Sequence, residues 1–148
     1  MPYIKSKERR GRIEMSVIMS DEKILNIANE KFLLTNGRRI TPSQGILYLR
    51  LIQHSLKNKI QTHNQDGFIV LLSLDEMCCE FNFGKTLIND TLKDFAKAGI
   101  IERRRLTARE KREILGENNC FGNYMVTKVL AENIFEKKES KGWQQELH

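Results

Sequence analysis

The stretch that decides the fold is residues 73–105, SLDEMCCEFNFGKTLINDTLKDFAKAGIIERRR. It opens on Ser73, which is followed three residues later by Glu76. This is the capping-box pattern that begins a helix, because each of the two side chains bonds to the backbone amide of the other residue. We therefore expect a short helix over residues 74–80. The next segment, Phe-Asn-Phe-Gly at residues 81–84, breaks that helix.

A longer helix is expected over Lys85–Ala98, because apolar side chains recur there at helical spacing. Ile88, Leu92 and Phe95 fall on one face, and Gly99 follows as a C-terminal stop. The opposite face has charged and hydrogen-bonding side chains, namely Thr86, Asn89, Asp90, Lys93, Asp94 and Lys97. An ordinary amphipathic surface helix explains this pattern in isolation, so its meaning depends on the neighbouring elements.

The flanking sequence adds one buried helix and three strands. Thr41-Pro42-Ser43-Gln44 has capping-box form with proline at the first helical position, and apolar residues follow at helical spacing. The further expected elements are a turn at 64–67, a strand at 68–72, a strand from Ile100 to Arg105, a basic loop at 106–119 and a returning strand at 121–129. Within that loop Thr107 and Glu110 repeat the capping-box spacing, so a short helix ending at Gly116 is possible there.

The order helix, strand, short helix, turn, longer helix, strand, basic loop, strand is that of a winged helix-turn-helix. The expected fold is thus mostly α with a small β hairpin, of class α+β. We divide the chain into a basic N-terminal arm with a possible strand (1–19, the strand at 13–19), the winged domain (20–130) and a C-terminal helix and polar tail (131–148, the helix at 131–139). The winged domain begins with a helix that Ser20 caps and Asn36-Gly37 ends.

Basic side chains are concentrated in two short segments. The formal net charge of the 148 residues is +6. Residues 5–12 contain five cationic side chains and one anionic one, and residues 103–112 contain six and one. The remainder of the chain is slightly acidic, so the clustering favours a polyanionic partner.

The arrangement suits duplex DNA. The major groove of B-DNA is about 12 Å wide and admits one α-helix, which a short preceding helix braces. Asn89 can pair bidentately with adenine, Lys85 or Lys93 can reach guanine or a phosphate, and Asp90 can accept from cytosine. The adjacent basic hairpin can reach phosphates or the minor groove.

Residues 73–105 resemble the N-terminal winged-helix domain of RepA-type plasmid replication initiators from Gram-positive bacteria. The likeness is clearest in the ending from Lys93 to Arg103, where Ala-Gly-Ile-Ile-Glu-Arg closes the pattern, and it extends more weakly from Leu34 to Val129. The resemblance implies that Lys85, Thr86, Asn89 and Lys93 are recognition-helix contacts. It implies wing contacts by Arg103, Arg104, Arg105, Arg109, Lys111 and Arg112.

Other site chemistries find little support. Gly84-Lys85-Thr86 ends like a phosphate-binding loop, but Cys79 stands where that motif needs glycine. Cys78 and Cys79 are adjacent, Cys120 is distant, and the histidines show no ligand spacing. We therefore expect no catalytic residue, no metal and no cofactor. The odd number of cysteines and the absence of a signal peptide or apolar span predict a cytoplasmic protein with no membrane association and no small-molecule substrate.

Three functions remain compatible with the sequence. The first is a replication or maintenance factor of a plasmid or mobile element, and the second is a stand-alone transcriptional repressor at an operator. The third is a winged helix that serves as a protein-interaction module. For the two DNA-binding functions we expect a homodimer, because one winged helix covers one half-site. The apolar face within Ile13–Leu34 is the expected interface, since it has no obvious place in a minimal winged core.

Overall fold

The computed structural model describes residues 17–62, 64–116 and 125–136. At its centre lies an antiparallel sheet in the order β1–β3–β2, made of β1 (Gly67–Val70), β2 (Ile101–Arg105) and β3 (Met125–Leu130). The helices are α2 (Asp21–Asn36), α3 (Pro42–Asn58), α4 (Leu74–Phe81), α5 (Lys85–Ala98) and α6 (Ala108–Glu110). A π-helical turn, η2 (Lys111–Leu115), continues α6, and a 3-10 turn, η4 (Ala131–Asn133), follows β3.

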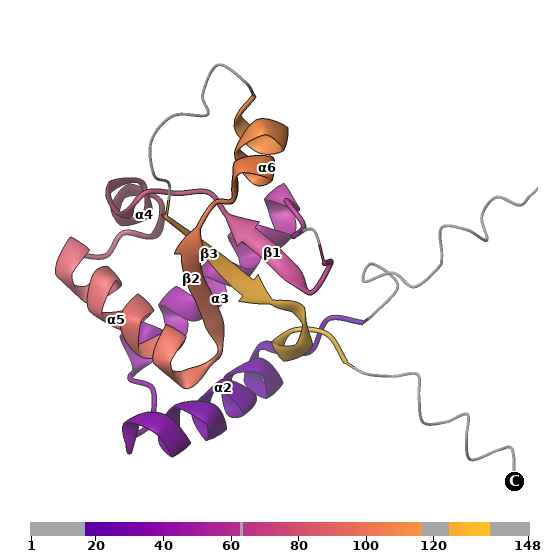
Figure 1. Ribbon diagram of the computed structural model, residues 1–148. Helices are drawn as coiled ribbons and strands as arrows, with labels where there is room; N and C mark the ends of the chain where they lie inside the picture. Colours follow the sequence, from indigo (N-terminus) through magenta and orange to yellow (C-terminus); the bar gives the residue numbers. More distant parts are fainter. Residues whose placement is uncertain (1–16, 63, 117–124, 137–148) are drawn as a thin grey trace, which may run out of the picture.

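The chain order α3, β1, α4, α5, β2, β3 and the sheet order β1–β3–β2 define a winged helix-turn-helix. The α+β class and the winged-helix fold expected from the sequence are therefore confirmed. Helix α2 precedes this unit and runs along one side of it, beside α5 (Figure 1). No helix in the described ranges is long and apolar enough to cross a bilayer.

The helix boundaries follow the capping residues. At α4, the Glu76 amide donates to Ser73 Oγ at 3.1 Å, and the Ser73 amide donates to Glu76 Oε1 at 2.8 Å. The box that begins α3 at Thr41 is formed in the same way. Helix α5 ends at Gly99, whose φ of 78° is a left-handed conformation that favours glycine. The two helices expected at 74–80 and 85–98 are thus confirmed, the first with Phe81 added.

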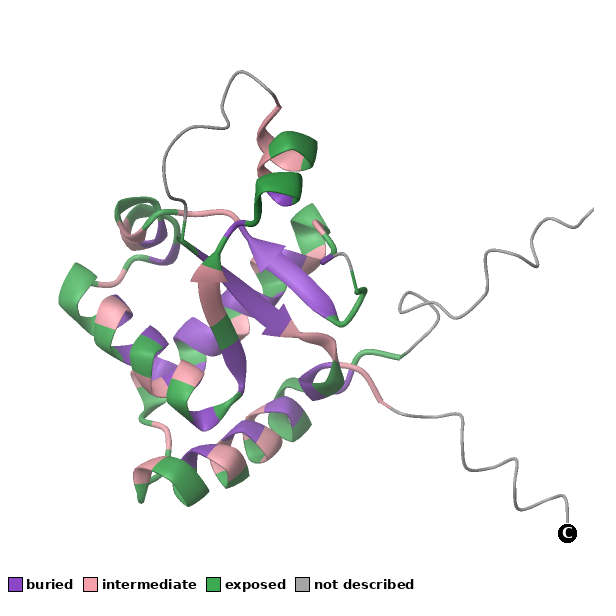
Figure 2. Ribbon diagram, viewed as in Figure 1, coloured by how far each residue is buried: buried purple, intermediate pink, exposed green. Residues whose placement is uncertain are grey.

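One face of the sheet packs against α2, α3 and α5 and forms the main core. Fully buried aromatic rings meet there, with Phe95 of α5 making edge-to-face contacts with Phe32 of α2 and Tyr48 of α3. Figure 2 shows the buried residues concentrated where these helices face the strands. Because α5 is anchored through its buried face to both neighbouring helices and the sheet, its opposite face has a fixed orientation.

The other face of the sheet, called here the outer face, is covered at the Leu106 end by α6 and η2 (Figure 1). Ile69, Leu106 and Val126 form a second apolar cluster, against which Ile114 and Leu115 pack. The Thr107–Glu110 capping box is present, and the helical segment ends at Gly116. The short helix suggested by the sequence within the basic loop is therefore confirmed.

Two terminal predictions need correction. In the described part of 13–19, Ile18 makes an isolated bridge with Phe135 rather than belonging to a strand. The helix expected at 131–139 is only the turn η4, because Ile134 is drawn into the main core and Phe135 pairs with Ile18. Residues 13–16, 137–139 and the beginning of the strand expected at 121–129 lie outside the described ranges. The two strands expected at 68–72 and 121–129 are observed at Gly67–Val70 and Met125–Leu130.

The apolar face of α2 is used inside the chain. Ile24, Ala28 and Phe32 are at most 2 % exposed and belong to the main core. The expectation that this face is free for dimerisation is therefore wrong. That expectation assumed that a minimal winged core has no place for this helix, but α2 packs along α5.

Candidate nucleic-acid interface

The candidate interface begins with the exposed face of α5. Lys85, Thr86 and Lys93 are exposed and Asn89 is half-buried, so the four recognition-helix residues implied by the sequence lie on the side away from the core. Gly84 is the N-cap of α5 and provides no side-chain bond, and a β-carbon at this position would meet no other atom within 4 Å. The amides of the first turn thus have no side-chain cap, and the positive end of the helix dipole can accept an anion there.

An arginine that sequence reasoning missed holds the turn between α4 and α5. Arg50 of α3 donates from Nη1 to the carbonyl oxygen of Phe81, and its guanidinium carbon lies 5.7 Å from the ring centre of Phe83. The two contacts fix both sides of the turn. The turn follows α4, whose C-cap residue, Asn82, has a left-handed backbone conformation. The only sequence signal for this role was a cation placed on the largely apolar helix α3.

A second missed contact fixes the middle of α5. Arg38, in the segment between α2 and α3, donates from Nη2 to Asp94 Oδ2 at 3.2 Å. Its guanidinium also lies over the ring of Phe32 at 5.0 Å. The negative charge of Asp94 is therefore compensated within the chain, which reduces its repulsion of a phosphate near α5.

The three consecutive arginines of β2 do not share a face. Side chains alternate along a strand, and the register pairs Ile101 with Val129 and Arg103 with Thr127. Since Ile101 and Val129 belong to the main core, Arg103 and Arg105 lie on the helix side of the sheet. Arg104 lies on the outer face.

Arg104 is engaged by Glu110 on that outer face. Its Nη1 and Nη2 donate to the two carboxylate oxygens of Glu110 at 2.7 and 2.9 Å, which is a bidentate pair. Arg104 and the bond from the Thr107 amide lower the pKa of Glu110 from 4.5 to about 2 despite its burial. This pair attaches α6 to β2, so Arg104 supports the wing from inside.

A neighbouring charged cluster on the outer face is also internally compensated. Lys128, 7 % exposed, contacts Asp66 Oδ2 at 2.8 Å and Glu102 Oε1 at 3.0 Å. Burial alone would lower the pKa of Lys128, but these two carboxylates outweigh it and raise the pKa. The cluster connects β3 to β2 and to the residue that precedes β1, and it contributes little net charge to the surface.

The remaining three predicted wing contacts lie on the covering segment. Arg109 belongs to α6 and contacts Glu113 Oε2 at 3.1 Å, while Lys111 and Arg112 belong to η2. The structure therefore separates the ten predicted contact residues into two groups. The helix side of the sheet carries Lys85, Thr86, Asn89, Lys93, Arg103 and Arg105, and the outer face carries Arg104, Arg109, Lys111 and Arg112.

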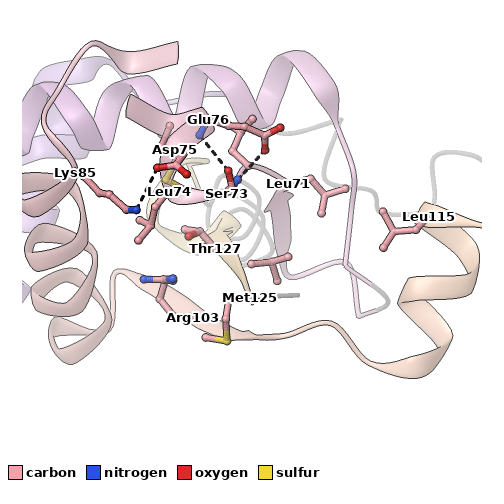
Figure 3. A pocket seen from close by; sticks show the side chains of 13 residues that line it. Leu71, Ser73, Leu74, Asp75, Glu76, Lys85, Arg103, Leu115, Met125 and Thr127 are labelled. Carbon is pink, nitrogen blue, oxygen red and sulfur yellow. Dashed lines mark hydrogen bonds and ion pairs between the residues drawn. The ribbon is translucent and has the colours of Figure 1, made fainter. Parts of the chain in front are cut away.

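A hollow of about 550 Å³ lies between the beginnings of α4 and α5 and the paired ends of β2 and β3. Lys85 and Arg103 both line it, so α5 and β2 meet there (Figure 3). Lys85 Nζ also lies 3.2 Å from Asp75 Oδ1, in a pair whose side chains are 60 % and 81 % exposed. Such an exposed pair is weak and can exchange for another anion at little cost.

Comparisons with known proteins give one structural similarity. No family model matches the chain, and no curated protein matches it. A solved structure described as the N-terminal domain of a DNA binding protein is similar with a TM-score of 0.49 and 12 % sequence identity. The alignment covers 100 % of this chain and 95 % of that one.

Proposed function

We propose that this chain is a non-enzymatic protein that binds double-stranded DNA in a sequence-specific manner through its winged helix. One observation supports this most directly. The polar face of α5, with its uncapped N-terminus, lies beside Arg103 and Arg105 on the same side of the sheet. The helix that would enter a DNA groove thus lies beside the cations that would hold the adjacent DNA backbone.

The dimensions and chemistry of α5 suit the major groove. Its 14 residues span about 21 Å at a rise of about 1.5 Å per residue. Asn89 is placed to pair with an adenine edge and Lys93 with guanine or a phosphate. Lys85 and the free amides of the first turn are placed for a phosphate at the groove edge.

The proposed wing contacts are Arg103 and Arg105 beside α5, with Arg109, Lys111 and Arg112 reaching the backbone farther along the duplex. Arg104 has a different role in this proposal, because Glu110 holds its guanidinium on the outer face. It positions α6 and the adjoining turn η2, on which the outer cations lie. This proposed role is the main difference from the contacts implied by the family resemblance.

The first test measures binding to a random duplex of about three helical turns by fluorescence anisotropy over a series of salt concentrations. Each phosphate contact that is lost should reduce the slope of log K against log salt by about 0.9. We expect that loss for Lys93→Gln and for Arg105→Gln. Matched controls are Lys57→Gln and Arg39→Gln, which change exposed cations on other surfaces. Equal slopes for the interface and control variants would contradict the proposal.

The second test addresses base recognition. A target is selected from a random duplex pool, and Asn89→Ala is then compared on the selected and random sequences. We expect a loss of about 1 to 3 kcal/mol on the target and little on random DNA. Asn26→Ala, at an exposed position of α2, is the matched control. Equal losses on both duplexes for Asn89→Ala would exclude base reading by this residue.

Two biological roles follow from DNA binding. We propose first a replication initiation or maintenance factor of a plasmid or mobile element, since residues 73–105 resemble that family. Transcription regulation as a repressor is the second, and both place the protein on cytoplasmic DNA. Footprinting separates them, because tandem repeats indicate an origin and a palindrome over a promoter indicates an operator. Unchanged cellular function after neutralising Arg103 and Arg105 would instead support a protein-interaction module.

Homodimerisation belongs to the same proposal, because two half-sites require two winged helices. The buried face of α2 is not available for it. Its exposed side offers Leu34, which is 86 % exposed, and Leu33, which is 46 % exposed. Sedimentation at tens of micromolar, with and without Leu34→Lys, tests this. A monomer at that concentration in the unmodified chain would exclude a stable dimer.

A further inference from the structure

The hollow beside Arg103 has the character of a small-molecule site. Its volume of about 550 Å³ falls within the range of about 300 to 1,000 Å³ found for ligand pockets. Figure 3 shows Lys85 and Arg103 toward one end, Leu115 toward the other, and Thr127 between them. Apolar side chains make up most of the lining, including Leu71, Leu72, Leu74, Met77, Leu115 and Met125.

Two polar atoms in this hollow lack partners. The hydroxyl oxygen of Thr127 and Nε of Arg103 are buried and have no hydrogen-bond partner in the described part of the chain. Thr127 is only 1 % exposed, and it lies opposite Arg103 in the strand register. Buried polar groups are nearly always hydrogen-bonded, so this adjacent pair indicates a ligand that supplies an acceptor to both.

The required acceptor is anionic. Burial lowers the pKa of Arg103, and no neighbouring carboxylate offsets that effect. The two carboxylates at the rim are engaged elsewhere, since Asp75 contacts Lys85 and Glu76 accepts from the Ser73 amide. Arg103 is therefore a half-buried cation without a counter-ion among the described residues, and burying such a charge is costly unless it is paired.

We propose that this hollow binds a small organic monocarboxylate. The carboxylate accepts from Arg103 Nε and from the Thr127 hydroxyl, and the hydrocarbon part lies against Leu72, Met77 and Met125. The apolar lining favours this ligand over a phosphate group of the DNA backbone, which has no hydrocarbon part to bury. The ligand is a bound effector and undergoes no reaction.

The site also has a consequence for DNA binding, which rests on the proposed function. Lys85 and Arg103 belong both to this hollow and to the candidate interface. A carboxylate on Arg103 removes a cation from the wing, so ligand and DNA should oppose one another. Reciprocal coupling requires that DNA weaken ligand binding by the same factor.

The experiment uses the full chain without DNA, so that its failure is separate from a failure of DNA binding. Octanoate is the probe and octan-1-ol is the uncharged comparison. Binding is followed by the NMR signal of the Arg103 Nε–H group and by the melting temperature. We expect a saturable shift and a higher melting temperature with octanoate, and at least tenfold weaker binding of octan-1-ol.

Two variants test the assigned contacts. Arg103→Gln should weaken octanoate at least tenfold with little change for octan-1-ol. Thr127→Val should also weaken octanoate while the protein stays folded, because it removes a hydroxyl that has no partner. Arg105→Gln changes a cation on the same sheet face that does not line the hollow, and should leave octanoate binding unchanged.

Several outcomes would overturn the proposal. One is equal binding of octanoate and octan-1-ol, and another is unchanged octanoate affinity in Arg103→Gln. Absence of any saturable shift would have the same meaning. A shift of the Arg103 signal by inorganic phosphate but not by octanoate would assign the hollow to the DNA backbone instead.

Discussion

Replacing Arg104 by methionine should destabilise the protein without removing a direct contact with a DNA phosphate. The guanidinium of Arg104 donates twice to Glu110, and the two side chains are 27 % and 10 % exposed. A third bond runs from Arg104 Nη1 to the Arg105 carbonyl oxygen at 3.1 Å. The substitution removes these bonds and leaves a largely buried carboxylate without its cation.

The pKa of Glu110 gives the size of the effect. It falls from 4.5 to about 2 in the folded chain, and each pKa unit corresponds to about 1.4 kcal/mol, so the whole environment stabilises the folded state by about 3 kcal/mol. Arg104 is the largest cause, while the Thr107 amide remains in the variant. We therefore expect a loss of about 2 kcal/mol at pH 7.

The sign of the pH dependence follows from the lowered pKa. A carboxyl whose pKa is lower in the folded state stabilises it above the pKa of the unfolded state, and that stability is lost as the pH falls toward the folded value. Between pH 7 and pH 3.5 the contribution of Glu110 should decrease by about 1.4 kcal/mol. Because Arg104→Met keeps the bond from the Thr107 amide, its own Glu110 contribution also decreases over this range. The difference between the native chain and Arg104→Met should therefore become smaller by only about 0.4 kcal/mol.

The assay is urea unfolding at pH 7 and at pH 3.5, together with the salt dependence of duplex binding. Arg105→Met is the matched control, because it makes the same substitution at the adjacent exposed position. It should change stability by less than about 0.5 kcal/mol and reduce the salt slope by about 0.9. Native stability with a reduced salt slope in Arg104→Met would refute the structural role assigned to Arg104.

Three further substitutions test other parts of the structure. Tyr48→Phe should raise the free energy of unfolding in urea by about 1 kcal/mol, since the buried Tyr48 hydroxyl has no hydrogen-bond partner in the described ranges. A decrease of that size in the free energy of unfolding would show that the hydroxyl does have a hydrogen-bond partner. Gly67→Ala should lower that free energy by at least about 2 kcal/mol, because the added methyl group meets the carbonyl oxygen of Val129. Gly84→Asp should stabilise α5 by a few tenths of a kcal/mol and yet weaken duplex binding at low salt, because its charge lies where a phosphate is proposed. Gly84→Ser adds a cap without that charge and is the control, so equal affinities of the two variants would contradict a phosphate at this end of α5.

The helices of the winged unit were predictable because their ends depend on local chemistry. The capping boxes at Thr41 and Ser73 and the glycine at position 99 each act within a few residues of the chain. Tertiary contacts did not alter them, so the expected and observed boundaries nearly coincide. The short helix beginning after Thr107 was visible in the sequence for the same reason.

The ends of the described chain were not predictable in this way. A helix was expected after Leu130, but Ile134 is held in the core and Phe135 pairs with Ile18. The Met19 amide donates to the Ile134 carbonyl oxygen at 2.8 Å, which joins segments more than a hundred residues apart. A contact of that kind outweighs the weak helix propensity of a short segment and leaves no local signature.

The candidate site was predictable in kind but not in detail. A cluster of six cations in ten residues indicated a polyanion partner, and it does lie in the wing. The pattern could not show which cations are compensated, because that depends on carboxylates brought close by folding. Strand alternation alone would have separated Arg104 from Arg103 and Arg105, and its nearby acidic candidates were Glu102 on the same strand face and the capping-box Glu110.

The same reasoning explains why net charge is a poor guide to the interface. The bidentate pair of Arg104 with Glu110 and the cluster around Lys128 use cations to hold the sheet and its covering segment together. Arg38 and Arg50 similarly hold α5 and the turn before it. Each of these residues adds to the +6 total while its charge or its donors are used within the fold. What remains for a partner is a smaller set of cations, in which Arg103 is distinctive because the described residues leave it unpaired in a hollow with apolar walls.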